Sequence, residues 1–233
     1  MRIFGAACLL LTATAANAGR PLTTEDAGFI DKGGVELENY YHRQTARGVE
    51  SLSGLHVQPS VGIGFNTQIG IGVDFLRQYN ADFEGRKSSG EYAIVGKTGL
   101  KALTDDEYGV AVAWSVDRTR APGERFRYDN AALNSALTVP LEQWLLHANL
   151  GWARTRLGKQ NSTTWALAAE RIAAIGPVDL AAESYGNDHN AAWLGVAARW
   201  VVKEDKLFID SSWAKQLGGE RSRAFTLGLK LAY

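Results

Sequence analysis

The sequence has little of what usually stabilises a small secreted fold. It contains a single cysteine, Cys8, which lies close to the N-terminus. If that region is removed during export, no cysteine remains, which excludes disulfides and thiolate metal sites from the mature chain. Long apolar runs are missing as well, because none approaches the roughly 18 residues that a transmembrane helix requires. A membrane-spanning form of this chain would therefore have to be built from strands.

Charge of one sign is also lacking, since 25 basic residues face 25 acidic residues. The net charge therefore indicates no partner. The four histidines are scattered along the chain and form no metal-ligand motif, so we expect neither a metal nor a cofactor. Gly62 and Gly64 alternate along an expected strand and precede no helix, which excludes a nucleotide-binding loop.

The N-terminus has the pattern of a secretory signal peptide. Arg2 gives a positive start, residues 6–13 are apolar, and Ala16-Asn17-Ala18 is a cleavage site of small residues. The apolar stretch is too short for a membrane helix. We expect residues 1–18 to be removed after Ala18, and export makes nucleic acid an unsuitable partner. Residues 19–34 show no strand pattern, and we interpret them as a periplasmic leader in the mouth or lumen of the fold.

The C-terminus predicts a membrane-facing strand. Phe225, Leu227, Leu229, Leu231 and Tyr233 alternate with small or polar residues, which gives one apolar face at a period of two. A strand that ends on an aromatic residue resembles the signal by which the barrel assembly machinery recognises its substrates, so we expect that machinery to bind here. A soluble periplasmic β-sandwich is the alternative.

Alternating segments recur along the chain and predict an all-β fold, a transmembrane antiparallel up-and-down β-barrel of about 12 strands over residues 35–233. The predicted strands are residues 35–43, 55–64, 68–76, 91–103, 108–117, 131–139, 144–153, 164–171, 178–185, 191–200, 207–214 and 223–233. Short connections alternate with longer, more polar ones, which is typical of periplasmic turns and outer loops.

Aromatic residues fall near the predicted strand ends, as two interfacial girdles require. The outer girdle comprises Tyr41, Phe75, Tyr92, Trp152, Trp165, Trp213 and Phe225. The periplasmic girdle comprises Tyr108, Trp144, Trp200 and Tyr233. A sandwich core would place most of these rings in mid-strand instead.

If the apolar faces contact lipid, the opposite faces line a lumen. Its charged residues are nine acids and four bases, joined by His147: Glu36, Glu38, Asp74, Glu91, Lys97, Lys101, Asp117, His147, Glu170, Asp179, Glu183, Arg199, Asp210 and Lys230. Many other inward positions are small, and twelve strands leave more space than the eight that side chains just fill. A narrow passage is the favoured interpretation, and inward charges that pair and plug the barrel are the alternative.

The predicted outer loops are basic. Guanidinium groups pair well with phosphates, so we expect these loops to face lipopolysaccharide, although they could simply be solvated. The candidate residues are Arg86, Lys87, Arg120, Arg125, Arg127, Arg154, Arg156 and Lys159.

An outer-membrane lipid hydrolase is the remaining alternative, because some barrels use serine and histidine for catalysis. His56 and Ser60 share a predicted strand face, but four residues of strand separate them by about 13 Å. A nucleophile and its base need about 3 Å. His147 and Asn149 share a face without a neighbouring serine. We therefore expect no catalytic residues and no enzyme activity.

The start of the expected mature chain resembles a known family. Gly19-Arg20-Pro21-Leu22-Thr23-Thr24-Glu25-Asp26-Ala27-Gly28, followed by Gly34-Val35-Glu36-Leu37-Glu38, is similar to proteobacterial outer-membrane barrels labelled as a phenol-degradation (MetA) pathway family or as barrel porins and transporters. The resemblance implies passive transport, with hydrophobic or aromatic compounds as the solute class.

These patterns predict a protein of the Gram-negative outer membrane. The favoured function is a narrow channel or passive transporter for small molecules. A plugged barrel with a structural or surface-binding role is the second interpretation, and a lipid hydrolase is the third.

Overall fold

The computed structural model describes residues 21–46, 50–80, 87–120, 123–156, 159–218 and 221–233, together with the backbone but not the side chains of residues 50, 80 and 87. The expected signal peptide and its cleavage site lie outside the described residues. Within the described part of the chain, no helix is long and apolar enough to cross a membrane.

Twelve antiparallel strands close into a barrel, which confirms the predicted fold class. Each strand pairs with its neighbours in sequence, and β1 closes the barrel against β12 through a register that runs from Glu36 opposite Ala232 to Thr45 opposite Arg223. The strands are β1 (Val35–Thr45), β2 (Glu50–Gly64), β3 (Thr67–Asn80), β4 (Lys87–Lys101), β5 (Gly109–Arg120), β6 (Arg127–Leu141), β7 (Trp144–Thr155), β8 (Gln160–Ile175), β9 (Val178–Asn187), β10 (Trp193–Lys203), β11 (Leu207–Gln216) and β12 (Arg223–Ala232).

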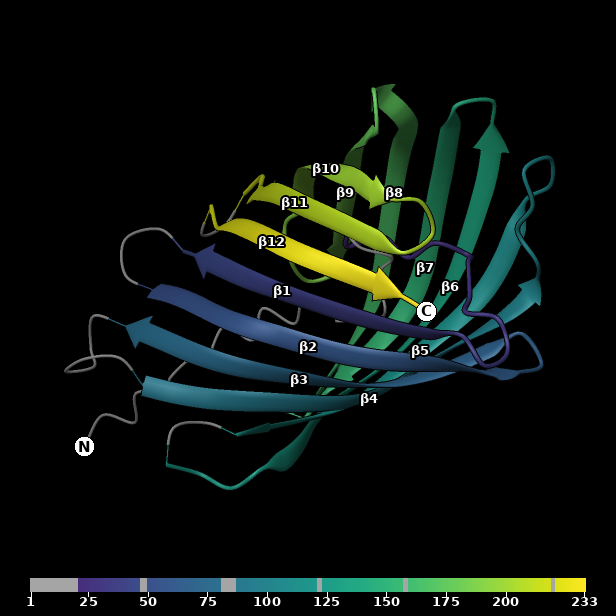
Figure 1. The fold of residues 1–233 in the computed structure, drawn as a ribbon. Helices are drawn as coiled ribbons and strands as arrows, with labels where there is room; N and C mark the ends of the chain where they lie inside the picture. Colours follow the sequence, from purple (N-terminus) through teal and green to yellow (C-terminus); the bar gives the residue numbers. More distant parts are fainter. Residues whose placement is uncertain (1–20, 47–49, 81–86, 121–122, 157–158, 219–220) are drawn as a thin grey trace, which may run out of the picture.

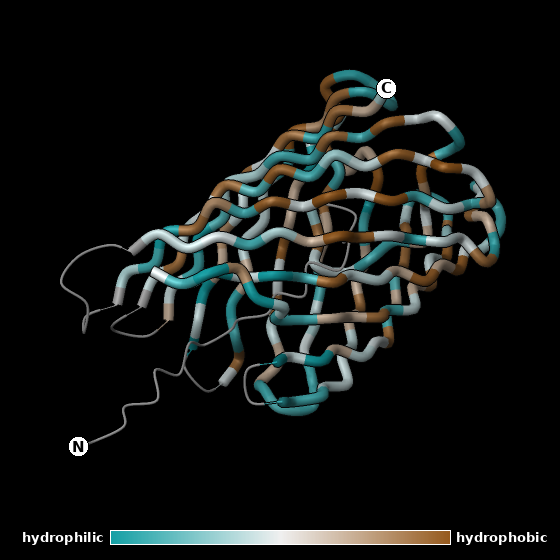
Figure 2. Tube along the Cα trace, turned by 90° about the horizontal axis from the view of Figure 1, so that it is seen from below, coloured by the Kyte–Doolittle hydropathy of each residue, from teal (hydrophilic) through white to brown (hydrophobic). Residues whose placement is uncertain are grey.

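The two faces of the wall differ as the alternating pattern predicts. In β5, Ala111, Ala113 and Ser115 are buried inside the barrel, whereas Val116 is 43% exposed on the outer surface. Figure 2 shows the same alternation of hydrophobic and hydrophilic residues along the strands. The exposed apolar face is continuous around a closed barrel, and it is the surface that a transmembrane barrel presents to lipid.

Most strands extend further than the apolar alternation indicates. The segments predicted as the loops 44–54, 77–90 and 118–130 are largely strand, and they leave connections of residues 46–49, 81–86 and 121–126. Lipid imposes alternation only where it contacts the wall, but backbone pairing can continue beyond the apolar band. The predicted contrast between short and long connections is consequently weaker in the structure, and the connection of residues 102–108 is longer than a tight turn.

The two ends of the barrel can be distinguished by the chain termini. The start of β1 and the C-terminus lie at one end, which we call the terminal rim, and the opposite end is the far rim (Figure 1). At the terminal rim, Phe65 and Asn66 join β2 to β3 with φ angles of 55° and 53°. Positive φ at both central residues is the geometry of the type I′ turn, which suits a two-residue hairpin.

The predicted orientation can be tested by surface labelling. We expect a short tag at Gly123, in the β5–β6 connection of the far rim, to be labelled on intact cells, because this rim should face outward. A tag at Asp105, on the terminal rim, should be labelled only after the outer membrane is permeabilised. The opposite pattern would contradict the orientation. A third predicted tag position, Gly85, lies outside the described residues.

Candidate functional site: a plugged lumen

The leader is located inside the barrel. Residues 21–34, which we call the plug segment, run through the lumen to the start of β1. Leu22, Thr24, Glu25, Ala27 and Ile30 are all buried, and Leu22 packs with inward-facing alanines of three wall strands. The segment itself thus occupies the lumen, whereas the alternative interpretation expected inward charges of the wall to pair and plug the barrel.

Side chains of the wall satisfy the backbone of the plug segment. Glu183 of β9 accepts hydrogen bonds from the backbone N–H groups of Thr23 and Thr24 at 2.8–3.0 Å, and from the Thr24 hydroxyl at 2.9 Å. An extended segment without neighbouring strands has no ladder to bind its N–H groups, and leaving them buried without partners would be costly. Glu183 therefore provides a polar anchor for the N-terminal part of the plug segment.

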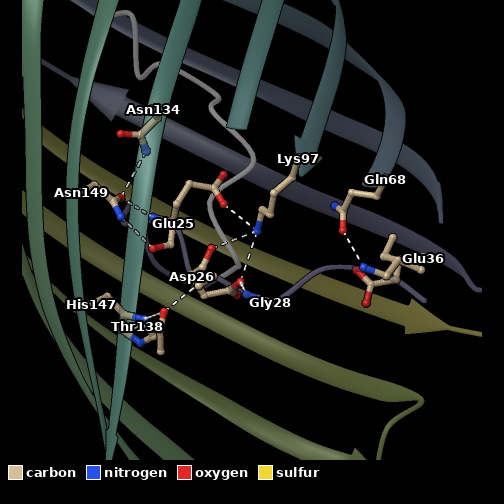
Figure 3. Close-up of polar contacts among 12 residues, drawn as sticks. Glu25, Asp26, Gly28, Glu36, Gln68, Lys97, Asn134, Thr138, His147 and Asn149 are labelled. Atoms are coloured by element: carbon tan, nitrogen blue, oxygen red, sulfur yellow. Dashed lines mark hydrogen bonds and ion pairs between the residues drawn. The ribbon is translucent and has the colours of Figure 1, made fainter. Parts of the chain in front are cut away.

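Three further wall residues continue this arrangement towards the terminal rim (Figure 3). The Asn149 side chain accepts from the Glu25 N–H at 2.7 Å and donates to the Glu25 carbonyl at 2.9 Å. Thr138 Oγ1 accepts from the Ala27 N–H at 2.9 Å, and Gln68 Oε1 accepts from the Ile30 N–H at 2.8 Å. The plug segment is thus bound through its backbone, by amide and hydroxyl groups from β3, β6 and β7.

A buried ion pair joins the plug segment to β4. The Lys97 ammonium lies 2.7 Å from Glu25 Oε2 and 3.2 Å from Asp26 Oδ1 (Figure 3). The Glu25 side chain is fully buried, and that of Lys97 is 5% exposed. Removing one partner of such a pair typically costs about 3–5 kcal/mol, because it leaves an uncompensated charge. Lys97 is therefore the main electrostatic anchor of the plug segment.

The same environment shifts the two acids of the plug segment in opposite directions. Burial raises the pKa of Glu25 to about 7, against the opposing attraction of Lys97. For Asp26, desolvation again acts to raise the pKa, but the Lys97 ammonium outweighs it and holds the pKa below its usual range. Asp26 is accordingly the more strongly ionised partner of Lys97.

Two glycines in the wall give the plug segment the space that it occupies. A methyl group at Gly62 of β2 would overlap the carbonyl oxygens of Ile30 and Asp31, and one at Gly99 of β4 would overlap the Phe29 ring. A side chain at Gly62 would displace the backbone of the segment, and one at Gly99 would require the Phe29 ring to move. The close approach of backbone to wall explains why glycine is needed here.

A polar cavity of about 190 Å³ remains beside the plug segment. It lies against β1, β2, β3, β4 and β12, and its lining includes Glu36, Gln58, Ser60 and Lys230. At roughly 30 Å³ for each molecule in the liquid, this volume corresponds to a few waters. The plug segment thus leaves polar space next to β1–β4 and β12.

Most of the predicted pore-lining residues face the inside of the barrel, and several are paired there. Lys230 lies 2.7 Å from Glu36 and 3.8 Å from Glu38. Arg199 and His147 each lie 3.6 Å from Glu170. Asp179 accepts from the Ala173 N–H at 2.8 Å. Asp210 is buried in β11.

The half of the lumen nearer the far rim is acidic. Asp74 accepts from His42 at 2.9 Å and from His56 at 2.6 Å. Glu91 lies opposite Asp74 in the register of β3 and β4, and Asp117 of β5 is bound by the Asn130 amide at 3.1 Å. The described residues show no ion pair between these acids and a lysine or arginine, so histidine and amide groups are their described partners.

Lys101 is a correction to the predicted lumen set. A bulge between Gly99 and Lys101 places Lys101 opposite Val110. Val110 faces outward, so Lys101 is not on the lumen face. The Lys101 ammonium lies 3.6 Å from the centre of the Tyr108 ring and 3.2 Å from Glu107. Lys101 therefore belongs to the terminal rim, because the bulge reverses the alternation that the sequence pattern assumes.

The candidate hydrolase residues do not form a catalytic arrangement among the described residues. His56 is bound to Asp74, and no contact joins it to Ser60. His147 Nδ1 lies 3.0 Å from Thr138 Oγ1, but that hydroxyl is fully buried and holds the plug segment. In the part of the chain that the structure describes, no cluster of His, Cys, Asp or Glu is arranged to hold a metal ion.

The predicted lipopolysaccharide-facing bases divide into three groups. Arg86 lies outside the described residues, as does the side chain of Lys87. Arg125, Arg156 and Lys159 lie in far-rim connections. Arg120, Arg127 and Arg154 are a correction, because they belong to strands that extend beyond the apolar band and not to loops.

The alternating pattern places Asn149 on the same strand face as His147, but it does not connect Asn149, Thr138 or Gln68 with the leader. A signal was present, since a leader without strand pattern must find partners for its backbone, and inward amides and hydroxyls can supply them. Neither the sequence nor the alternation says which strands the leader crosses, so the pairings were not predictable.

No protein-family model and no curated protein sequence matches the chain. Among solved structures, it is similar to the KdgM porin in complex with disordered oligogalacturonate, with a TM-score of 0.62 and 7% identity over 85% of this chain and 99% of that one. It is similar to the COG4313 outer membrane channel from Pseudomonas putida F1, with a TM-score of 0.62 and 12% identity over 89% and 98% of the two chains.

The β domain of the Bordetella autotransporter BrkA is also similar, with a TM-score of 0.52 and 14% identity over 86% of this chain and 99% of that one. Porins, a channel and an autotransporter domain thus share this architecture, so the fold does not decide among their functions. The phenol-degradation label of the family resemblance stays a prediction. The chain has the fold of the outer-membrane porin and channel barrels.

Proposed function

We propose that this protein is a narrow outer-membrane channel or passive transporter for small molecules, closed in the observed state by its own N-terminal plug segment. The observation that carries the proposal is a closed barrel whose polar lumen is occupied by a separate segment. This segment continues into β1 at the terminal rim and is held inside by hydrogen bonds and an ion pair to the wall. A wall packed shut by its own side chains would need no such segment. The terminal rim would face the periplasm.

The solute class follows from the lining. Carboxylates, amides and histidines lie among small alanines in the described lumen, and Tyr185 and Trp193 stack there with ring centres 6.0 Å apart. This lining favours small polar or cationic solutes over the hydrophobic or aromatic compounds that the family resemblance implies. The comparisons support a barrel of the channel type and name no solute for this chain.

The proposal is tested by ion selectivity in planar bilayers. Nine acids and, without Lys101, three bases of the predicted set remain on the wall. A narrow, low-dielectric wall strengthens their field, whereas exposed basic residues at the far rim are screened within about 8 Å at physiological salt. We expect reversal potentials under a salt gradient to show a preference for cations. Anion preference would contradict the assignment of the lumen face.

A permanently closed structural barrel is the second candidate, and the buried contacts of the plug segment favour it. In that case, well-folded protein should show no channel activity, even when the plug segment has been removed.

A further inference from the structure

Four basic residues form a strip on the outer surface near the far rim. Lys215 of β11, Arg223 of β12, Arg43 of β1 and Arg77 of β3 are all exposed, and all occupy outward positions of neighbouring strands. Lys215 lies directly opposite Arg223 in the β11–β12 register. Arg43 and Arg77 each lie opposite Ser53 of β2, one from either side. We call this set the outer basic strip.

This arrangement is unfavourable without an anion. Like charges directly opposite one another on a sheet face are destabilising, and Lys215 and Arg223 are such a pair. The described residues show no ion pair for any member of the strip. By contrast, Arg118 of β5 donates to the Phe126 carbonyl at 3.3 Å, and Arg120 lies over the Phe126 ring. Among the described residues, the bases of the strip therefore have fewer partners than Arg118 and Arg120.

An apolar surface lies directly below the strip. Trp213 and Phe225 are opposite one another on β11 and β12, and Phe225 is opposite Arg43 on β1. Tyr41 and Leu227 form the next outward pair towards the middle of the wall. These four side chains are 40–50% exposed. Bases above an aromatic and aliphatic surface match a ligand with phosphates at one end and acyl chains at the other.

The spacing favours a headgroup with more than one phosphate. Arg43 and Arg77 are two strands apart, which corresponds to about 9.5 Å, and Lys215 with Arg223 lies on the other side of Arg43. One phosphate could bind between Lys215 and Arg223 and another near Arg43 and Arg77, with two-pronged hydrogen bonds from the guanidinium groups. We propose that the outer basic strip binds the bisphosphorylated headgroup of lipid A, the membrane anchor of lipopolysaccharide. This inference rests on the outer-membrane location and orientation proposed above.

The test is lipid binding by the full mature protein, folded in detergent without lipopolysaccharide. Lipid A, monophosphoryl lipid A and inorganic phosphate are titrated while the tryptophan fluorescence is followed, because Trp213 lies beside the strip. We expect lipid A to bind most tightly, and the double variant Lys215→Gln with Arg223→Gln to weaken its binding by about tenfold or more. Native mass spectrometry provides a second measurement of the bound lipid.

The matched control removes two exposed bases at the opposite, terminal rim, through Lys203→Gln with Lys206→Gln. It should leave lipid A binding within about twofold of the unmodified protein, since one good charged hydrogen bond is worth more than that. Equal loss in both double variants would overturn the proposal in favour of general charge attraction. Equal binding of inorganic phosphate and lipid A would overturn the lipid as ligand. Conductance is measured separately. The lipid A proposal can therefore be contradicted while the channel proposal is supported, and the channel proposal can be contradicted while lipid A binding is observed.

Discussion

Removal of residues 19–30 is expected to raise the single-channel conductance of the protein by about tenfold or more, because a twelve-stranded wall without a plug leaves an open passage. The deletion takes away the backbone groups bound by Glu183, Asn149, Thr138 and Gln68. It retains residues 31–34, which connect to β1. The measurement is conductance in planar bilayers, with the unmodified mature protein recorded under the same salt.

A point variant tests the same prediction without shortening the chain. Gly62→Val places a branched side chain where the Ile30 and Asp31 carbonyls lie, so the plug segment has to move away from β2. We expect an intermediate rise in conductance or frequent transitions between two levels. The heat-modifiable shift on electrophoresis checks that each barrel is folded. Folded deletion protein that stays closed would contradict the gating role and favour the structural barrel.

The second large effect concerns the lipid face. Val112→Arg should lower the free energy of unfolding by about 2–4 kcal/mol, the usual cost of arginine at the bilayer midplane. Val112 is the fourth residue of β5 and lies within its outward apolar run from Val110 to Val116, between the buried Ala111 and Ala113. Denaturant unfolding of the protein in lipid vesicles measures the change.

The matched control for this prediction is an inward position one strand away. Asn134 of β6 lies opposite Ala113 and is only partly buried in the polar lumen. Asn134→Lys should cost less than about 1 kcal/mol, because the lumen side of the wall offers water and carboxylates instead of lipid. Effects of similar size at the two positions would show that the assignment of faces is wrong.

The sequence was sufficient for the barrel because one rule acts at every strand. A residue that contacts lipid must be apolar, whereas the residues before and after it in the strand face the lumen and can be polar. The resulting alternation of apolar and polar residues identifies each strand and its two faces. The ends of the strands were predicted less accurately than their existence. Lys87, Arg120 and Arg127 continue the backbone ladder beyond the region where lipid requires apolar side chains. The lumen position predicted for Lys101 is wrong because a bulge shifts the alternation, and the residue types around the bulge do not indicate it.

The interior was less predictable for a different reason. The acids and bases of the lumen could be named from alternation, but the pairing of Lys97 with Glu25 and Asp26 joins a strand to a segment that has no periodicity. Such contacts depend on the position of the leader inside the barrel, and no local sequence pattern predicts this position. Each strand of the barrel can therefore be predicted from its own sequence, whereas the contacts of the plug segment can be identified only in the assembled structure.

Closure of the barrel through β1 and β12 also determines when the lumen can become occupied during folding. The plug segment is attached directly to β1, yet its anchors at Asn149 and Glu183 lie 124 and 159 positions further along the chain. Contacts of such separation carry a large loop-closure cost and form late. The protein must therefore assemble its wall as far as β9 before the plug segment can reach both anchors, and seating of the plug segment follows formation of those strands.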